Sequence, residues 1–494
     1  MIRKKVLLIL ALATAASIAF SVTACVASNN VSIDSSETTT TTANNIVVTG
    51  EEITNANDGE HAIEVSGNTA EYSNIKVTKT GDSQSGDEAD FYGENSAIFA
   101  TDGATLTLTD IVVDTNGTHA NAVFSYGSGT TVNISNSTIT TSGNCSGGLM
   151  TTGGGTMNAT NLDIHTTGNS SAAIRSDRGG GTVNVDGGTY VTDGKGSPAI
   201  YSTADITVSN AALESTQSEG VVVEGKNSVT LNDVDLTANN TTHNSDKSIT
   251  YNAVMIYQSM SGDASVGLAK FTMTGGSITN KNGDVFFVNN TATTITLENV
   301  EIVNQDAEGV FLRAAAAGWG SEGSNGGKVN LYLKNQTLTG DIVVDKVSAL
   351  NMYMSSGTTY TGAVNADNAG KVYVEIEKGS KWVLTGDSYI SSLTCDADAI
   401  DLNGHKLYVD GKEYTAGTAS TGTALEIATE SSSSGKPDGM PGEPPSGDKP
   451  SGGPGGNGTP PSGDPPGDPP SGDPPSGGPG GNGGEPPAKP SENN

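Results

Sequence analysis

A short pattern of apolar and polar positions gives the first indication of structure. The stretch "VNISNSTI" (132–139) has apolar residues at its first, third and eighth positions and asparagine at its fifth. Alternation with a period of two is typical of a strand that buries one face. Asparagine is one of the few residues that tolerates a positive φ. We therefore predict two short strands joined by a bend at Asn136, with Ile134 and Ile139 pointing inward on either side of it.

The same eight-residue pattern recurs ten times in the body of the chain, mostly 23–26 residues apart. The fifth position always holds Asn, Asp or Gly, so we predict a bend in every copy. These bend residues are Asn74, Asp110, Asn136, Asn161, Gly187, Asn210, Asp233, Gly275, Asn299 and Asn335.

A third apolar patch follows about ten residues after each copy, as in "NAVFS" (121–125) and "GVFLR" (309–313). Three short strands in each repeat of this length predict one coil of a parallel β-helix, in which stacked coils share a core. The fold class that we expect is all-β. It is a single-stranded right-handed parallel β-helix over 46–417, with roughly thirteen coils stacked over about 60 Å. The phrase "AIDLNGHKLYVDG" (399–411) is a candidate cap, with His405 in a structural role.

This repeat resembles the right-handed parallel β-helix, or pectin-lyase-like, superfamily. The resemblance implies either pectin-cleaving enzymes or non-catalytic carbohydrate-binding and adhesin-like surface proteins. The strings NTD, DD, GHG and RIK, which the resemblance associates with the hydrolases, do not occur. A lyase needs a basic residue, and Arg175 and Arg178 lie together in "IRSDRGGG" beside Asp177. We favour a surface ion pair at a turn over a catalytic base for these arginines.

The N-terminus has the features of a secretory leader. Three cationic residues in "MIRKK" precede a 17-residue apolar run, and "VTAC" ends at Cys25. The pattern predicts a signal peptide at 1–24, and "VTAC" resembles the lipobox of bacterial lipoproteins, which implies lipidation of Cys25. Cleavage after Ala24 or Ala27 without lipidation is the alternative. A lipoprotein would be secreted and attached to the outside of the cell membrane through a polar tether (25–45).

The C-terminal segment changes abruptly in composition. Eighteen of the 19 prolines lie between Pro437 and Pro490, in variations on "PPSGD". Such a sequence cannot form a packed core, so we expect a disordered, partly polyproline-II tail over 418–494. It is either a spacer within cell-wall polymer or a passive tail.

Net charge and side-chain chemistry limit the classes of molecule and ion that we expect the protein to bind. The formal charge of −31 disfavours nucleic acid and anionic lipid. We expect no cofactor. Calcium on the acidic stretch "GDSQSGDEAD" (81–90) is a weaker alternative to solvated loop charges. Four histidines lack metal-binding spacing, and we interpret them as solvated turn or strand residues: His61, His119, His165 and His243.

Uneven coil lengths give a hypothesis for a ligand site. The connections at 257–270 and 313–330 are longer than their counterparts and leave from the same corner, two coils apart. Insertions in solenoids often form the binding face. We predict that these two loops bind a polysaccharide or cell-surface glycan, with Trp319 as a stacking platform. The alternative is that Trp319 folds onto its own alanines and covers the coil. The other predicted ligand residues are Tyr257, Gln258, Asp263 and Arg313.

Three classes of function stay open on this evidence. The first is a non-catalytic, adhesin-like surface lipoprotein that binds glycans or host surfaces. The second is an extracellular polysaccharide lyase or hydrolase, and the third is a structural stalk.

Overall fold

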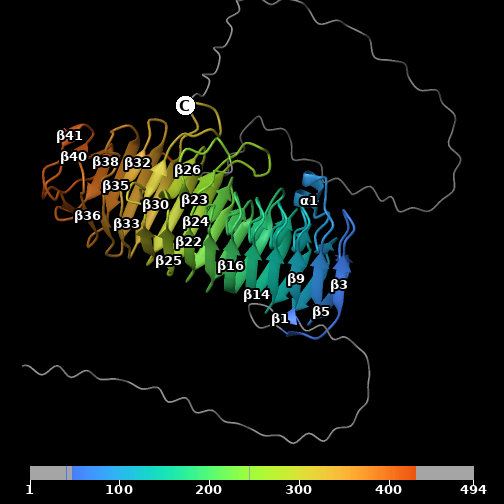
Figure 1. The fold of residues 1–494 in the computed structure, drawn as a ribbon. Coiled ribbons are helices and arrows are strands. Elements are labelled where there is room, and N and C mark those ends of the chain that lie inside the picture. Colours follow the sequence, from blue (N-terminus) through green and yellow to red (C-terminus); the bar gives the residue numbers. More distant parts are fainter. Residues whose placement is uncertain (1–39, 42–46, 244, 430–494) are drawn as a thin grey trace, which may run out of the picture. The chain divides into compact units, whose positions relative to one another are not determined.

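The computed structural model describes residues 40–41, 47–243 and 245–429. The predicted leader, the lipidation site Cys25 and the proline-rich part of the tail lie outside the described residues. Within them, the chain winds into a right-handed parallel β-helix, so the predicted fold class is confirmed (Figure 1).

The apolar patches of the repeats pair in parallel into an eleven-stranded sheet. Its register joins equivalent positions of successive coils; for example, Val123 pairs with Ile98 on one side and Leu149 on the other. In chain order its strands are β4 (Ile63–Ser66), β7 (Ile98–Thr101), β10 (Val123–Tyr126), β13 (Leu149–Thr152), β15 (Ile174–Ser176), β17 (Ile200–Ser202), β20 (Val221–Glu224), β23 (Asn252–Tyr257), β26 (Asp284–Asn289), β29 (Leu312–Ala314) and β32 (Ile342–Val344).

The two strands of the eight-residue pattern form a 21-stranded sheet, which continues around the bend. Its strands are β3 (Glu52–Asn55), β5 (Thr69–Ser73), β6 (Lys76–Lys79), β8 (Thr105–Thr109), β9 (Val112–Thr115), β11 (Thr131–Ser135), β12 (Thr138–Thr141), β14 (Gly155–Thr166), β16 (Gly181–Thr192), β18 (Asp205–Ser209), β19 (Ala212–Ser215), β21 (Ser228–Asn232), β22 (Asp235–Ala238), β24 (Leu268–Thr274), β25 (Ser277–Asn280), β27 (Ala292–Glu298), β28 (Glu301–Asn304), β30 (Lys328–Lys334), β33 (Ala349–Ser355), β35 (Lys371–Ile376) and β38 (Ser392–Cys395).

Smaller sheets complete the two ends of the described chain. A four-stranded sheet contains β31 (Thr337–Thr339), β34 (Thr359–Thr361), β36 (Lys381–Val383) and β39 (Ile400–Asp401). A three-stranded sheet contains β37 (Ser388–Ile390), β40 (Leu407–Val409) and β41 (Lys412–Glu413), and a pair contains β1 (Thr40–Thr41) and β2 (Val47–Val48). The antiparallel pairing of β40, which lies in the predicted cap (399–411), with β41 directly after it ends the parallel stack.

All ten predicted bends have a positive φ, from 45° at Asn335 to 76° at Gly187. Adjacent bends also bond to each other: the side-chain Nδ2 of Asn161 donates to Oδ1 of Asn136 at 3.0 Å. Ile134 is 2 % exposed and Ile139 is fully buried, as the period of two predicts. One continuous apolar core therefore runs inside the coils from Ile63 to Leu407.

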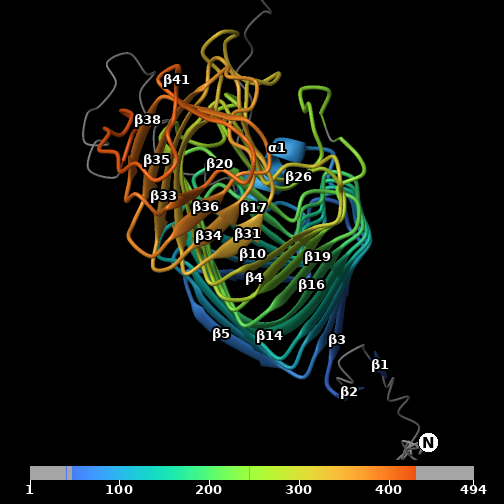
Figure 2. The same cartoon turned by 90° about the vertical axis from the view of Figure 1, so that its left-hand side faces the viewer.

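The described residues contain one helix, α1 (Gly86–Tyr92), within the insertion at 80–97. The hydroxyl of Ser85 caps its first turn, and Gly93 ends it at a φ of 84°. Figure 2 shows α1 and the long loops on the same side of the cross-section. Among the described residues, no helix has the length and apolar character needed to cross a membrane.

The beginning of the predicted tail lies against the coils. Residues 418–429 run beside the outer face of the 21-stranded sheet, and Ser420 forms an isolated bridge with Cys395. The Asn330 side chain, on β30, donates to the carbonyl of Ala428 at 3.1 Å. We call residues 418–429 the strap.

Candidate functional site

Four insertions flank the outer face of the eleven-stranded sheet. Those at 80–97 and 239–251 precede strands of this sheet, and those at 258–267 and 315–327 follow them. Arg178 joins the two sides, because its guanidinium lies 3.9 Å from the centre of the Phe91 ring of α1 and 2.8 Å from a carboxylate oxygen of Asp263. The insertions therefore form a cover over part of this sheet.

The two loops that we predicted to meet do meet. The Asn290 side chain, from the coil between them, donates to the carbonyl of Gln258 at 2.8 Å and packs against Gly320. The rings of Tyr257 and Trp319 contact each other edge to face, with their centroids 5.1 Å apart.

The predicted role of Trp319 as an exposed platform is wrong. Its residue surface is only 8 % exposed. Asn325 closes the loop over it by donating to the carbonyls of Ala317 and Trp319, at 2.7 and 2.8 Å. Trp319 thus covers the outer face of the sheet, as in the alternative interpretation. It packs in a cluster with Val222, Met255, Tyr257, Phe287 and Ala315.

The remaining predicted ligand residues have partners within the protein. Arg313 Nε lies 2.6 Å from a carboxylate oxygen of Asp284. Asp263 pairs with Arg178, and the buried Gln258 side chain donates to the carbonyl of Ala264 at 3.2 Å. Of the five residues, the structure brings the side chains of Tyr257 and Trp319 into contact and engages the others separately.

A buried carboxylate beneath the insertion at 258–267 was not recognised from the sequence. Glu224 is 1 % exposed and accepts hydrogen bonds from the hydroxyls of Tyr201, Tyr257 and Ser259. Burial and the negative charge of Glu224 raise the pKa of Tyr257 well above its ordinary value. "GVVVE" resembles any other buried strand, so only the folded loop identifies Glu224 as a buried acceptor.

Arg175 lies at the centre of a second cluster. Its Nη2 is 2.7 Å from Asp177 and 3.3 Å from Asp90, and its side chain is 13 % exposed. Burial alone would lower the pKa of Arg175, but the two carboxylates outweigh it and raise this pKa above its ordinary value. The ion pair predicted for Arg175 is confirmed, but the residue lies on β15 with a mostly buried side chain and not at a surface turn. A guanidinium held charged in this way is poorly suited to accept a proton.

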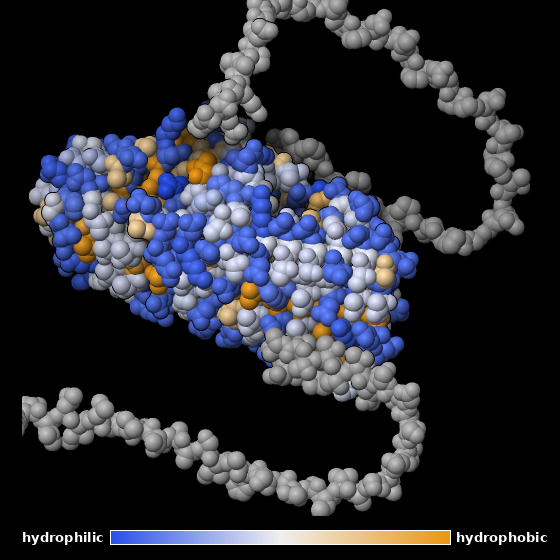
Figure 3. All heavy atoms as spheres, in the orientation of Figure 1, coloured by the Kyte–Doolittle hydropathy of each residue, from blue (hydrophilic) through white to orange (hydrophobic). Residues whose placement is uncertain are grey.

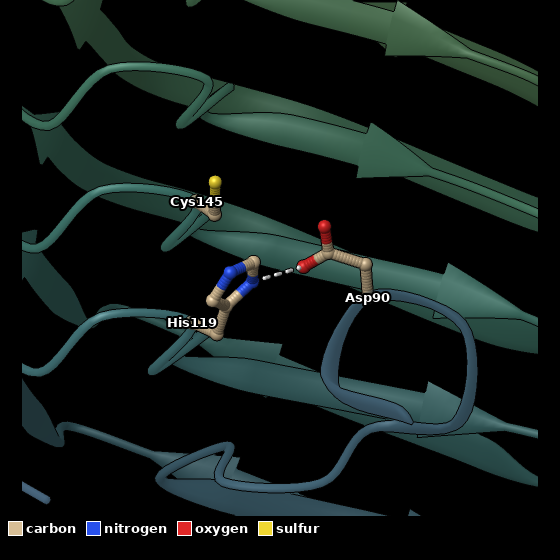
Figure 4. Close-up of side chains that lie close together, drawn as sticks. All are labelled: Asp90, His119 and Cys145. Atoms are coloured by element: carbon tan, nitrogen blue, oxygen red, sulfur yellow. Dashed lines mark hydrogen bonds and ion pairs between the residues drawn. The ribbon is translucent and has the colours of Figure 1, made fainter. Parts of the chain in front are cut away.

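The acidic stretch at 81–90 supplies the third cluster (Figure 4). His119 Nδ1 lies 3.1 Å from Oδ1 of Asp90, and the Cys145 sulfur lies within 4.8 Å of the ligand atoms of both residues. The hydrogen bond with Asp90, and after it the nearby Cys145, raise the pKa of His119 to about 10. Burial raises the pKa of Asp90, but Arg175 and His119 outweigh it and lower this pKa. His119 lies in a turn, as expected, but its side chain is only 17 % exposed and pairs with Asp90.

The outer face of the 21-stranded sheet carries an open groove of about 430 Å³. It spans three successive coils, at β14, β16 and β18, and amide, hydroxyl and carboxylate side chains line it together with Ala159 and Val185. The lining residues are Asn158, Ala159, Thr160, Asn184, Val185, Asp186, Thr207, Ser209 and Asn210. Figure 3 shows that one face of the molecule is mostly hydrophilic, with scattered apolar residues.

The groove belongs to a longer row of outward side chains, which we call the polar row. The parallel register places one member on each successive coil, so the members lie about 4.8 Å apart. The polar row consists of Asn133, Asn158, Asn184, Thr207, Thr230, Thr272, Thr296, Tyr332 and Tyr353.

Hydrogen bonds and ring contacts order the two ends of the polar row. At one end, Asn184 donates to Asn158, which donates to Asn133, at 3.0 and 2.9 Å. At the other end the rings of Tyr332 and Tyr353 stack with centroids 4.7 Å apart. Aligned copies of the eight-residue pattern place Asn133, Asn158 and Asn184 at the same outward position, and the structure pairs them across successive coils.

The fold and these surfaces define a right-handed parallel β-helix protein with a partly covered small sheet and a large sheet whose outer face carries the polar row and, near β30 and β33, the strap. No protein-family model matches the chain, and no curated protein matches it in sequence.

Proposed function

We propose that this protein is a non-catalytic, glycan-binding β-helix of the cell surface, and that the polar row is its binding face. The observation that carries this proposal is the alignment of amides, hydroxyls and two stacked tyrosines along successive coils. Asparagine and threonine side chains exchange hydrogen bonds with sugar hydroxyls, and tyrosine rings cover the apolar C–H faces of pyranoses. The coil spacing of about 4.8 Å is close to the length of one sugar ring.

The ligand that fits this face is a neutral, extended polysaccharide. The polar side chains that line the groove are amides, hydroxyls and one carboxylate, Asp186, whose Oδ1 accepts a hydrogen bond from Asn210 at 2.7 Å. With a formal charge of −31 for the whole chain, a polyuronate would be repelled. A rigid sheet also presents these groups without an ordering cost at binding.

Binding is favoured over cleavage by the state of Arg175. Two carboxylates hold its guanidinium, so the side chain that the lyase alternative needs as a base is engaged. Arg175 is not part of the polar row and does not line the groove.

The test is a panel of soluble polysaccharides, run by affinity electrophoresis and calorimetry on the mature chain. We expect a neutral polysaccharide to bind and Tyr353→Ala to weaken it about tenfold, the upper end for one aromatic contact. Tyr389→Ala is the matched control, because Tyr389 stacks on Tyr408 at 4.9 Å but lies off the row. If Tyr353→Ala and Tyr389→Ala bind the polysaccharide equally well, the polar row is not the binding face. Release of new chain ends from any polysaccharide would support the enzyme alternative.

The proposed location rests on "VTAC" at the end of the apolar leader. Mass spectrometry of the N-terminal peptide should show a lipidated Cys25, and Cys25→Ala should release the protein into the medium. An unmodified N-terminal peptide in the wild-type protein would refute the anchor without bearing on glycan binding.

A further inference from the structure

The cluster of Asp90, His119 and Cys145 is built on a repeated corner of the β-helix. His119 and Cys145 occupy the same position in adjacent coils, because Val123 pairs with Leu149. The next two coils place Ser170 and Gly196 there. All four residues have a positive φ, between 55° and 63°.

A positive φ is costly for most side chains, and glycine or asparagine is the usual solution. His119 and Cys145 therefore occupy backbone positions that do not favour them. The corner itself is held by serines one position later: Ser146 Oγ accepts from the amide of Ala120 at 2.9 Å, and Ser171 Oγ accepts from the amide of Ser146 at 3.0 Å. Neither the imidazole nor the thiol is needed for these bonds.

The third member reaches the corner from α1. Hydrogen bonding of Thr152 Oγ1 to the carbonyl of Phe91, at 2.7 Å, docks the helix on the sheet. Asp90 then faces His119 from the opposite side of the corner (Figure 4). One oxygen, one nitrogen and one sulfur donor lie within 4.8 Å of one another.

The surroundings orient the carboxylate and leave one side open. Arg175 Nη2 lies 3.3 Å from Oδ2 of Asp90, which leaves Oδ1 directed at His119. Contacts of this kind to ligand side chains fix ligand geometry in metal sites. The side chains of His119 and Asp90 are 17 % and 15 % exposed, so solvent reaches the cluster.

We propose that Asp90, His119 and Cys145 bind a divalent transition-metal ion, and that Zn²⁺ fits this donor set best. Zinc accepts carboxylate, imidazole and thiolate together, whereas calcium and magnesium prefer oxygen alone. Three protein ligands leave a fourth position for water or another exchangeable ligand.

The test is calorimetric titration of the mature chain with Zn²⁺, with Cys25→Ser in every sample so that the leader cysteine cannot contribute. We expect one equivalent to bind with micromolar or tighter affinity, and Ca²⁺ not to compete. Cys145→Ser and His119→Asn should each weaken binding at least about tenfold. Both variants should fold, because Ser170 occupies the same corner in the next coil and asparagine tolerates a positive φ.

Cd²⁺ provides a second readout that does not depend on affinity. The charge-transfer band of a Cd²⁺–thiolate bond should appear in the Cys25→Ser chain. It should persist when Cys395→Ser is added, since Cys395 lies on β38, and vanish when Cys145→Ser is added. Absence of Zn²⁺ binding, or equal binding by Cys145→Ser, would overturn the proposal. Rapid alkylation of Cys145 by iodoacetamide without metal binding would also overturn it and would assign the trio a nucleophilic role.

Discussion

Asn351 holds the backbone of Leu425 with both ends of its side-chain amide. Its Oδ1 accepts from the amide of Leu425 at 2.9 Å, and its Nδ2 donates to the carbonyl at 3.0 Å. The same Nδ2 also donates to Oδ1 of Asn330 at 2.9 Å, and Asn330 in turn bonds Ala428. Two asparagines on adjacent strands thus fasten the strap across the coils.

Asn351→Ala should therefore loosen the strap while leaving the coils intact. The loss of two hydrogen bonds to the strap should cost about 1–2 kcal/mol locally, because the freed backbone groups regain water. Limited proteolysis should cut the variant faster within 418–429, and the Leu425 amide should exchange faster. The control is Asn158→Ala, which removes an asparagine of the polar row and should change neither the proteolysis rate nor the exchange of the Leu425 amide. If Asn351→Ala also leaves both rates unchanged, other contacts hold the strap.

The inward positions of the repeat should be far less tolerant than their neighbours. Ile134→Asp would place an unpaired carboxylate in the stacked core, at a cost of several kcal/mol. Ser135→Asp, on a half-buried outward position, should change the free energy of unfolding by no more than about 0.5 kcal/mol. Thermal or denaturant unfolding of the two variants provides the comparison, and similar losses would contradict the assigned faces.

Most of the fold was predictable from the sequence because each coil repeats one local solution. Apolar alternation, the bend residue and the repeat length all act within one coil, and the stacked register follows from them. The environment of Trp319 was not predictable in this way. Its burial depends on Asn325 closing the loop and on Phe287 and Met255 beneath it, and the sequence pattern does not reveal these contacts between coils.

The proposed metal site was also only partly predictable from the sequence. Asp90, His119 and Cys145 are separated by 29 and 26 residues, which matches no short ligand motif. The 26-residue step is one coil, so aligning the repeats places Cys145 beside His119. Nothing in the repeat predicts that the insertion containing Asp90 folds into α1 and returns to that corner.

Trp319 should stabilise the protein rather than bind ligand by stacking. Trp319→Ala would remove its contacts with Tyr257 and Phe287 from a cluster that is mostly buried, at a cost of about 3 kcal/mol. The thermal midpoint should fall, whereas glycan binding measured below the transition should stay within twofold of wild type. Trp319→Phe should lose less stability. A stable Trp319→Ala protein with abolished binding would restore the stacking hypothesis.

Asp306 should make one coil sensitive to acid. Its carboxylate accepts from the amides of Gly283 and Glu308, at 2.7 and 2.9 Å, and these bonds hold its pKa below the ordinary value. A lowered pKa stabilises the folded state above the unfolded value of about 3.9, and this stabilisation is lost as the pH falls through the folded value.

Asp306→Asn should consequently be less stable than wild type at pH 7, by at most about 1 kcal/mol because the site is near solvent. The difference should disappear at low pH. Chemical denaturation at several pH values measures it, and a difference that grows on acidification would show that the sign is wrong.

The bend residues allow a last comparison within one repeat. Asn136 has a φ of 47° and accepts a hydrogen bond from Asn161. Asn136→Ala introduces a residue that disfavours this φ and removes the acceptor, so it should cost about 1–2 kcal/mol. Asn136→Gly removes the acceptor but suits the φ, and Gly187 and Gly275 already occupy the same bend in other coils. Glycine should therefore recover most of the loss in equilibrium unfolding. If alanine and glycine are equally destabilising, the amide ladder and not the backbone conformation determines the residue at this corner.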